Sequence, residues 1–265
     1  MTVDETRVAD DLFGVAGKVV LVTGGSRGIG EAIAEGFVKA GARVYICGRK
    51  ADACEATAKR LSDYGECYPV PADLSSVEAC RELAEKLARR ETRVDVVVNN
   101  AGTLWAAGID EYPESGWDKA FDLNVKGPFF LAQALLPLLR KSGTREDPAR
   151  IINIGSIDAF HIPRHETYAY TSSKAAVHQL SLHLAHRLAA ERITVNVIAP
   201  GMFFSKMMEA TVEKEGADTV LGSVPLRRFV EASDMAGTAI YLASRAAAFV
   251  TGVVIPVDGG YATTL

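Results

Sequence analysis

Val19-Val-Leu-Val-Thr-Gly-Gly-Ser-Arg-Gly-Ile-Gly30 is the stretch that decides how this chain folds. Its first four residues are apolar and mostly β-branched, which is typical of a buried parallel strand. Four glycines follow within eight residues, and then a segment with helical spacing that places Ile33 and Phe37 on one face and ends at Gly41. Strand, glycine loop and helix form the unit that cradles phosphates, because glycines let backbone N–H groups approach and a helix N-terminus favours anions.

The spacing of the glycines is weaker evidence for nucleotide binding than the position of the loop between a strand and a helix. The loop reads Gly-x-x-x-Gly-x-Gly, whereas the common dinucleotide fingerprint is Gly-x-Gly-x-x-Gly. A glycine-rich turn in another type of strand–helix unit is the alternative. The placement between an apolar strand and a helix favours nucleotide binding.

The end of the second predicted strand indicates which nucleotide is bound. This strand, Arg43 to Cys47, runs into Gly48-Arg49-Lys50, where a NAD site normally has an acidic residue for the ribose 2′-hydroxyl. The first acid is Asp52. A 2′-phosphate needs cations, and Arg49 together with Arg27 of the glycine loop would supply them. The sequence therefore favours NADP(H) over NAD. The alternative, an ordinary solvated basic residue, is more credible for Lys50 than for the two arginines.

Strands and helices alternate along the rest of the chain. Further strands are expected at 67–72, 94–98, 150–155, 193–198 and 253–257, and helices at 52–63, 76–90, 115–141, 168–190 and 232–244. This alternation predicts an α/β fold, a single-domain Rossmann-type, doubly wound parallel sheet of seven strands with helices on both faces. We expect the strand order 3-2-1-4-5-6-7.

We expect one domain over residues 17–265. Residues 1–16 are polar and are interpreted as a loosely held extension. Residues 202–225 are amphipathic and irregular and form a candidate substrate lid, in which Phe203, Phe204, Met207 and Met208 cluster. That cluster suits an apolar acyl chain and suits packing of the lid onto the body equally well.

Composition argues against several classes of partner. The chain has 265 residues and a net charge of −4, without a basic patch dense enough for nucleic acid. Gln133 and Pro137 interrupt the best apolar run, so no membrane span is expected, and the N-terminus has no apolar signal region. The spacing of the four cysteines matches no zinc site, which predicts reduced thiols in a cytoplasmic protein without a bound metal.

Polar residues at predicted strand ends are candidate ligand contacts. Asn99-Asn100-Ala101-Gly102 follows the fourth strand and Ser156 follows the fifth, at the edge where open α/β sheets bind ligands. Asp73, after the third strand, would either cap the next helix or touch an adenine amino group, and the cap is favoured. Asn124 lies among apolar residues inside a predicted helix, so its amide is either solvated or specifically hydrogen-bonded.

Tyr170 and Lys174 lie one helical turn apart, which places both side chains on one face. A phenol ionises near pH ~10, and a neighbouring ammonium favours the phenolate and lowers its pKa. Tyr168 has Ser172 as its neighbour one turn on, so it is not the partner of Lys174. A Tyr-x-x-x-Lys pair alone is usually a solvated helix face, and its weight here comes from the other motifs.

Taken together, the motifs resemble those of the classical short-chain dehydrogenase/reductase family. They span about residues 17–260 in the family's order. The matching segments are Thr23 to Gly30, Asp73-Leu74, Asn99 to Gly102, Leu123-Asn124-Val125, Ser156, Tyr170 to Lys174, and Asn196 to Gly201.

The resemblance implies a role for each matching residue. Tyr170 would be the general acid, and Lys174 would lower its pKa and bind the nicotinamide ribose. Ser156 would hold the substrate oxygen, and Asn124 would hold a water that links Lys174 to a proton relay. The residues implied in cofactor binding are Gly24, Ser26, Arg27, Gly28, Ile29, Gly30, Arg49, Asp73, Leu74, Asn100, Ala101, Gly102, Tyr170, Lys174, Pro200, Gly201 and Ser205. Ser205 stands where the family often has threonine.

Within the family the chain looks most similar to NADPH-dependent β-ketoacyl reductases of the rhamnolipid-pathway type. The resemblance implies reduction of a small-molecule carbonyl, such as a 3-oxoacyl thioester. It also implies a homodimer or homotetramer formed through the two long helices, 115–141 and 168–190, and often through the last strand. Reduction of another ketone (a sugar, polyol, steroid or xenobiotic carbonyl) and a non-catalytic NADP-binding sensor or scaffold are the alternatives. His161 and His165 lie in a proline-containing loop, where helical metal-ligand geometry is not expected.

Overall fold

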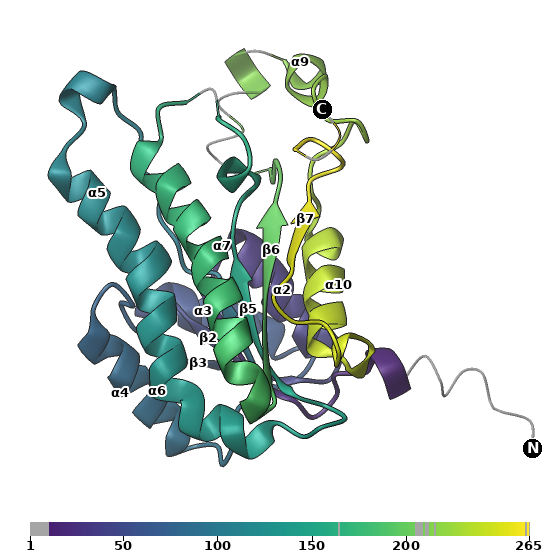
Figure 1. The fold of residues 1–265 in the computed structure, drawn as a ribbon. Helices are drawn as coiled ribbons and strands as arrows, with labels where there is room; N and C mark the ends of the chain where they lie inside the picture. The colour runs from purple at the N-terminus through teal and green to yellow at the C-terminus, as the bar shows by residue number, and fades with distance from the viewer. Residues whose placement is uncertain are drawn as a thin grey trace, which may run out of the picture.

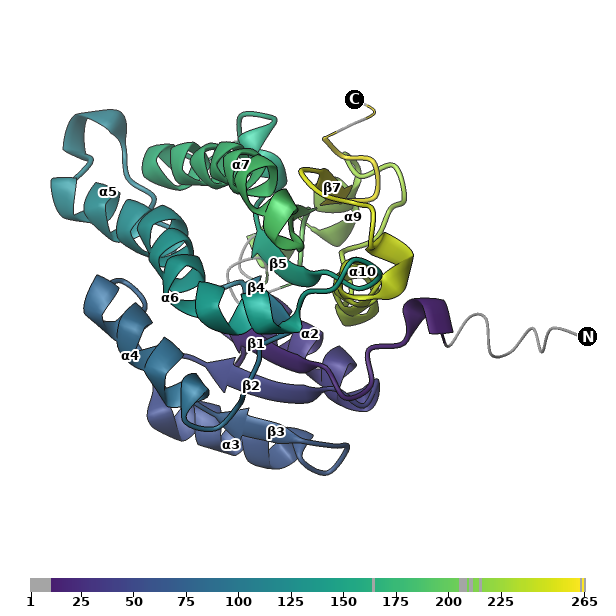
Figure 2. The same cartoon turned by 60° about the horizontal axis from the view of Figure 1, so that its bottom comes forward.

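The computed structural model describes residues 11–163, 165–204, 209, 212–214, 216–262 and 264. Within them, seven parallel strands form one sheet in the order β3-β2-β1-β4-β5-β6-β7 (Figures 1 and 2), which confirms the predicted order. The strands are β1 (Val19–Thr23), β2 (Arg43–Cys47), β3 (Cys67–Pro69), β4 (Val96–Asn99), β5 (Ala149–Ile154), β6 (Ile193–Pro200) and β7 (Val254–Val257).

Helices connect successive strands and cover both faces of the sheet, as Figure 2 shows. They are α2 (Gly28–Lys39), α3 (Ala51–Leu61), α4 (Val77–Ala88), α5 (Glu114–Phe121), α6 (Gly127–Ser142), α7 (Tyr168–Leu188), α9 (Ala217–Leu221) and α10 (Ala232–Ala243). Short 3₁₀ turns lie at Ile109–Glu111, Ile157–Ala159, Ala189–Glu191 and Arg245–Ala247. Among the described residues, no helix combines the length and apolar character needed to cross a membrane.

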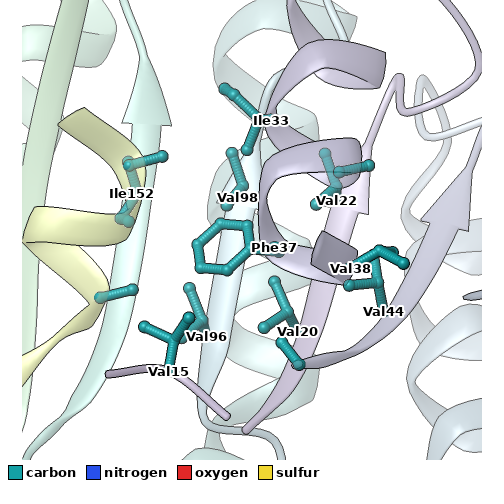
Figure 3. Close-up of a cluster of buried hydrophobic side chains, with 14 of the residues drawn as sticks. Val15, Val20, Val22, Ile33, Phe37, Val38, Val44, Val96, Val98 and Ile152 are labelled. Atoms are coloured by element: carbon teal, nitrogen blue, oxygen red, sulfur yellow. The ribbon is translucent and has the colours of Figure 1, made fainter. Parts of the chain in front are cut away.

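The two layers of core follow from the alternation of side chains along the central strands. Val20 and Val98 point to the layer covered by α2 and α10, where Phe37 of α2 packs against the sheet (Figure 3). Leu21 and Val97 point to the opposite layer, which packs against α4, α6 and α7. Burying each large apolar side chain contributes about 1.5–3 kcal/mol, so both faces of the sheet hold the strand ends in place.

The packed body begins earlier than the sequence predicted. Val15 lies in the segment interpreted as a loose extension, but its side chain is 2% exposed and belongs to the core layer of Phe37. Gly17, with φ +73°, donates from its backbone N to the carbonyl oxygen of Gly41 at 2.9 Å. This turn brings Val15 over the end of α2, where apolar surface is available.

The long helix predicted over 115–141 is interrupted. A π-helical turn, Asp122–Lys126, joins α5 to α6, and Pro128 stands in the first turn of α6. Proline donates no backbone hydrogen bond, and wide turns of this kind are frequent at functional sites. Asn124 lies in this turn, and its position is set by contacts described below.

The edge strand β3 is also shorter than expected. The predicted strand ran over 67–72, whereas β3 ends at Pro69. The backbone beyond Pro69 still pairs with the neighbouring chain, because the Val70 N donates to the Ile46 carbonyl oxygen at 2.9 Å and the Ala72 N to that of Gly48 at 3.2 Å. The chain therefore stays beside the end of β2 as far as Ala72.

Candidate active site

The candidate residues gather at the carboxyl edge of the sheet, where β1, β4, β5 and β6 end. β1 lies between β2 and β4, so the chain runs outward in opposite directions on either side of it. Crevices outside the carboxyl ends of strands at such a switch point bind ligands in open α/β sheets. The glycine loop follows β1, and Ser156 lies two residues after the end of β5.

The glycine loop leaves room for an anion because side chains are sterically excluded from it. Gly24 and Gly28 have φ values of +65° and +58°, which residues other than glycine rarely adopt. A Cβ on Gly30 would lie 2.3 Å from both the Asn100 Nδ2 and the Gly24 carbonyl oxygen. Arg27 occupies the N-cap of α2, and its side chain makes no capping hydrogen bond to a described residue. The first-turn N–H groups of α2 therefore suit a phosphate.

Asn100 and Thr23 fix this loop from inside. The Asn100 Nδ2 donates to the carbonyl oxygen of Thr23 at 2.9 Å and to that of Gly24 at 3.3 Å. The Thr23 Oγ1 accepts from the backbone N of Asn100 at 3.0 Å and of Ala101 at 2.9 Å. The Asn100 amide thus shapes the phosphate loop, which the sequence did not indicate.

The two arginines predicted to select NADP(H) lie where the sequence placed them. Thr23 pairs with Cys47 at the ends of β1 and β2, so the residues that follow the two strands are neighbours. Arg27 and Arg49 are exposed there, and neither is ion-paired with a carboxylate among the described residues. Ser26 also lies next to the end of β2, because its Oγ would be 3.2 Å from a Cβ placed on Gly48. Exposed guanidinium groups beside a serine hydroxyl suit a 2′-phosphate.

Asp73 does not cap the next helix, contrary to the favoured interpretation. Ser76 is the N-cap of α4, and its Oγ accepts from the Ala79 N at 3.1 Å. Asp73 is exposed and accepts from the backbone N and the Oγ of Ser75, at 3.2 and 2.9 Å. Ser76 is the N-cap because it is the residue with extended backbone angles immediately before the helix. The side chain of Leu74 belongs to the core.

The structure brings Ser156, Tyr170 and Lys174 together. Ser156 is 6% exposed, and its backbone N donates to His178 Nε2 at 3.4 Å. On α7 the Lys174 Nζ lies 5.6 Å from the centroid of the Tyr170 ring. Tyr168, on another face of the helix, is exposed and donates to Glu166 Oε1 at 2.7 Å. The choice of Tyr170 over Tyr168 as the partner of Lys174 therefore agrees with the geometry.

Burial dominates the ionisation of this cluster. It raises the pKa of Tyr170 to about 12, against a favourable interaction of the phenolate with Ser156, while the negative charge of Asp158 raises it further. Burial lowers the pKa of Lys174 to about 8, and Asp158 opposes that shift. We expected Lys174 to lower the pKa of Tyr170, but the pKa is raised, with burial as the largest cause, and Lys174 is not among the groups that shift it.

The side chain of Asn124 forms hydrogen bonds to two separate segments through both its oxygen and its nitrogen. Its Oδ1 accepts from the backbone N of Thr103 at 2.8 Å, and its Nδ2 donates to the Thr103 carbonyl oxygen and to Ser173 Oγ, both at 2.9 Å. An amide can make few further hydrogen bonds once these are formed. The side chain therefore ties the segment after β4 to α7. The relay water that Asn124 is expected to hold stays a prediction. Gly102 lies between the two polar side chains, since its Cβ would be 3.2 Å from Asn124 Oδ1 and 3.7 Å from Lys174 Nζ.

The remaining predicted contacts lie at the end of β6. The Gly201 N donates to the Val257 carbonyl oxygen at 2.9 Å, and a Cβ on Gly201 would lie 2.7 Å from the Asp258 Cα. Pro200 is the last residue of β6. Ser205, like Met207 and Met208 of the predicted lid, lies outside the described residues.

Two residues near the cluster were not assigned to the site from the sequence. Asp158 follows Ser156 by two positions, and His178 lies one turn beyond Lys174 on the same face of α7. Burial lowers the pKa of His178 to about 4, and Lys174 lowers it further. Helical spacing from Lys174 was the available signal for His178. His161 lies 3.8 Å from Asp158, and no group of three or more potential metal ligands occurs in the described part of the chain.

The parallel sheet, the phosphate loop and the Ser156–Tyr170–Lys174 cluster are those of a nucleotide-dependent oxidoreductase. A family model described as "Enoyl-(Acyl carrier protein) reductase" matches residues 24–262, and the chain belongs to the short-chain dehydrogenase/reductase family.

The similarity extends to individual members of the family. The chain is 51% identical over 250 residues to the rhamnolipids biosynthesis 3-oxoacyl-[acyl-carrier-protein] reductase of Pseudomonas aeruginosa, covering 94% of this chain and 98% of the relative. A solved NADP active-site complex of Pseudomonas aeruginosa RhlG superposes with a TM-score of 0.91 at 50% identity, covering 95% of this chain and 98% of that one. The gluconate 5-dehydrogenase of Gluconobacter oxydans is 31% identical, covering 96% of this chain and 98% of the relative.

Proposed function

We propose that this protein is an NADP(H)-dependent oxidoreductase that reduces the carbonyl of a 3-oxoacyl thioester to a secondary alcohol. The observation that carries the proposal is the cluster of Ser156, Tyr170 and Lys174 beside the glycine loop, at the edge of the sheet where ligands bind. The half-identical relative named as a 3-oxoacyl-carrier-protein reductase supports the substrate class, and the NADP complex of RhlG supports the cofactor.

The residues present fit NADP(H). The glycine loop and the N-terminus of α2 would hold the pyrophosphate, and Arg27 and Arg49 the 2′-phosphate. Lys174, fixed at the end of β5, would bind the nicotinamide ribose hydroxyls. When bound, NADPH supplies the hydride that the reduction requires.

Tyr170 supplies the proton. Its pKa of about 12 keeps it a phenol at neutral pH, so it can donate a hydrogen bond and then a proton to the substrate oxygen. Ser156 donates a second hydrogen bond to the same oxygen and so holds the carbonyl in place for Tyr170. Lys174, when protonated, stabilises the negative charge that develops on the phenol as its proton leaves.

Apolar side chains at the same edge of the molecule favour an acyl substrate. Phe160 and Ile162, in the loop after Ser156, are 50% and 94% exposed. Phe204 follows β6 and is 49% exposed, and Leu226, hydrogen-bonded through its N to Gly259, is 65% exposed. Such exposed apolar residues beside a site suit a hydrocarbon chain better than a sugar acid.

We further propose that the protein is a cytoplasmic homodimer or homotetramer. All four cysteines are buried free thiols, which fits a reducing compartment. Trp117 of α5 and Leu182 of α7 are more than 40% exposed, and Val253 beside β7 is 37% exposed. These apolar positions lie on the elements through which the family resemblance implies assembly.

Substrate profiling of the purified protein tests the activity. NADPH or NADH would be offered with a short 3-oxoacyl thioester or with 5-ketogluconate, and the loss of nicotinamide absorbance recorded. We expect turnover of the thioester with NADPH, and a kcat/KM about tenfold or more lower with NADH, since a 2′-phosphate adds charge-assisted hydrogen bonds. Preferential reduction of 5-ketogluconate would show that the substrate is a sugar acid and not a 3-oxoacyl thioester. NADPH binding without turnover of either compound would favour the alternative of a non-catalytic sensor.

A further inference from the structure

Three polar side chains on one face of α7 contact the end of β5. Lys174, His178 and Ser181 follow one another at helical spacing, about one turn apart. Lys174 donates to the carbonyl oxygen of Ile154, and the Ser181 Oγ accepts from Asn153 Nδ2 at 2.7 Å. The proposed mechanism gives Lys174 a role but gives none to His178, which lies between the other two.

His178 contacts the residue that is proposed to hold the substrate oxygen. Its Nε2 accepts a hydrogen bond from the backbone N of Ser156 at 3.4 Å, and the residue is buried, with 7% of its surface exposed. The ring of Phe160, in the loop after Ser156, lies 5.2 Å from the imidazole between centroids. The imidazole therefore packs against the chain at the point where it leaves β5 for the catalytic loop.

Gly155 makes this close approach possible. A Cβ on Gly155 would overlap His178 Nε2 and would lie 2.7 Å from His178 Cδ2, so any side chain here would push the imidazole away from the Ser156 N. The Gly155 backbone cannot give way easily, because its N donates to the carbonyl oxygen of Ile198 on β6 at 2.8 Å. The missing side chain of Gly155 and the ring of His178 are therefore complementary in shape.

The imidazole of His178 is an acceptor at neutral pH. Burial, and after it the positive charge of Lys174, lowers the pKa of His178 to about 4. A neutral imidazole has one N–H and one free nitrogen. Because the Ser156 backbone N–H can only donate, Nε2 is the free nitrogen and Nδ1 carries the proton.

We propose that His178 is a positioning residue, whose Nε2 accepts from the Ser156 N–H and so holds the Ser156 hydroxyl where it meets the substrate oxygen. The proposal rests on the proposed role of Ser156 in carbonyl reduction. The Ser156 Oγ accepts from the Asp158 N at 3.1 Å, which leaves the hydroxyl proton for the substrate. A displacement of reacting groups by about 1 Å lowers turnover on the order of 10²-fold, so the backbone position of Ser156 matters for catalysis.

Two variants of His178 separate the hydrogen bond from packing. Glutamine and methionine side chains have nearly the same length, but only glutamine carries an oxygen that accepts a hydrogen bond well. We expect His178→Met to lower kcat for the 3-oxoacyl thioester about 10- to 100-fold without a change in NADPH affinity, and His178→Gln to retain most of the wild-type turnover. His183→Met, at an exposed position of the same helix, is the control and should turn over like the wild type.

Hydrogen exchange at the Ser156 amide tests the contact without any substrate. Labelling of glycine carbonyls with ¹³C and of serine nitrogens with ¹⁵N selects three amides by NMR, those of Ser26, Ser156 and Ser223. We expect the Ser156 amide to exchange at least about threefold faster in His178→Met than in the wild type or in His178→Gln, because one hydrogen bond is lost. The other two amides should keep their rates. Equal exchange of Ser156 in all three proteins overturns the proposal.

The tautomer of His178 in the wild-type chain is a second requirement. The ¹⁵N shifts of histidine ring nitrogens distinguish a protonated nitrogen from a free one, and the signals of His178 are those absent from His178→Gln. We expect a free Nε2 and a protonated Nδ1 at pH ~7. A protonated Nε2 overturns the proposal, even if His178→Met does not fold.

The outcome for His178 is distinguishable from the outcome for the proposed function. If the wild type does not reduce the thioester, the proposed substrate is wrong, and the exchange and tautomer measurements still decide whether His178 holds Ser156. If the wild type reduces it and His178→Met does so at the same rate, the positioning role alone is rejected. Equal loss of turnover in His178→Met and His178→Gln would show that packing, and not the hydrogen bond, sets the site, and also overturns the proposal.

Discussion

Lys174 on α7 donates a 2.7 Å hydrogen bond from its Nζ to the carbonyl oxygen of Ile154, the last residue of β5. The lysine is 6% exposed, and Ile154 itself belongs to the core. The position of the ammonium is therefore set by packing of a helix against the central sheet. The same contact places it beside Ser156, two residues further along the chain.

The cost of burying Lys174 should be visible in the pH dependence of stability. Its pKa falls from 10.5 in the unfolded chain to about 8 in the folded protein. Between these values the unfolded state binds more protons, so the free energy of unfolding rises with pH, by about 3 kcal/mol in all. Lys174→Met should lack this rise, measured by urea unfolding at several pH values from 8 to 10.5.

Lys126→Met is the matched control for that titration. Lys126 is 44% exposed and paired with Asp122, so its substitution should keep the wild-type slope. A slope in Lys174→Met equal to that of the wild type would mean that the lysine is not desolvated in solution.

The glycine loop makes a steric prediction. In Gly30→Ala the new methyl group would lie 2.3 Å from the Asn100 side chain and from a backbone oxygen, so the loop must shift. We expect a loss of about 1–3 kcal/mol in unfolding free energy, as for other overpacked sites, together with loss of NADPH binding. Gly237→Ala, in α10 with open space around it, should instead stabilise the protein by about 0.5–1 kcal/mol.

Thermal unfolding and titration with NADPH would compare these two variants. A Gly30→Ala protein that binds NADPH like the wild type would show that the loop does not approach the cofactor closely.

Arg49 provides the test of cofactor choice. Removal of its guanidinium in Arg49→Ala should weaken NADPH binding about 10- to 100-fold, the range for one or more charge-assisted hydrogen bonds. NADH has no 2′-phosphate, so its affinity should change little. Lys59→Ala removes an exposed cation from the far half of α3 and serves as the control. Equal losses for NADPH and NADH would place Arg49 away from the 2′-phosphate.

Local sequence patterns were sufficient to predict the fold and the pairing of Tyr170 with Lys174 in the site. The apolar run of β1 and the alternation of strands and helices predicted the sheet, and helical spacing predicted that Tyr170 and Lys174 share a face. These features depend on residues that are neighbours in the chain, so sequence reasoning can find them.

Features set by distant contacts were missed. The π-helical turn at Asn124 depends on hydrogen bonds to Thr103, which lies 21 residues earlier. The burial of Val15 depends on the layer formed by α2, and the raised pKa of Tyr170 depends on burial by the whole cluster. No pattern along the chain reports such long-range effects.

The central claim is that Tyr170 donates the proton in carbonyl reduction, and comparison of two tyrosine variants tests it most directly. The measurement is the rate of NADPH oxidation with a 3-oxoacyl thioester by Tyr170→Phe and by Tyr168→Phe, with NADPH affinity determined in parallel. We predict that Tyr170→Phe lowers kcat about 10²- to 10⁴-fold with little change in NADPH affinity, while Tyr168→Phe turns over like the wild type. Turnover by Tyr170→Phe within about twofold of the wild type would contradict the assignment of the proton donor and with it the proposed mechanism.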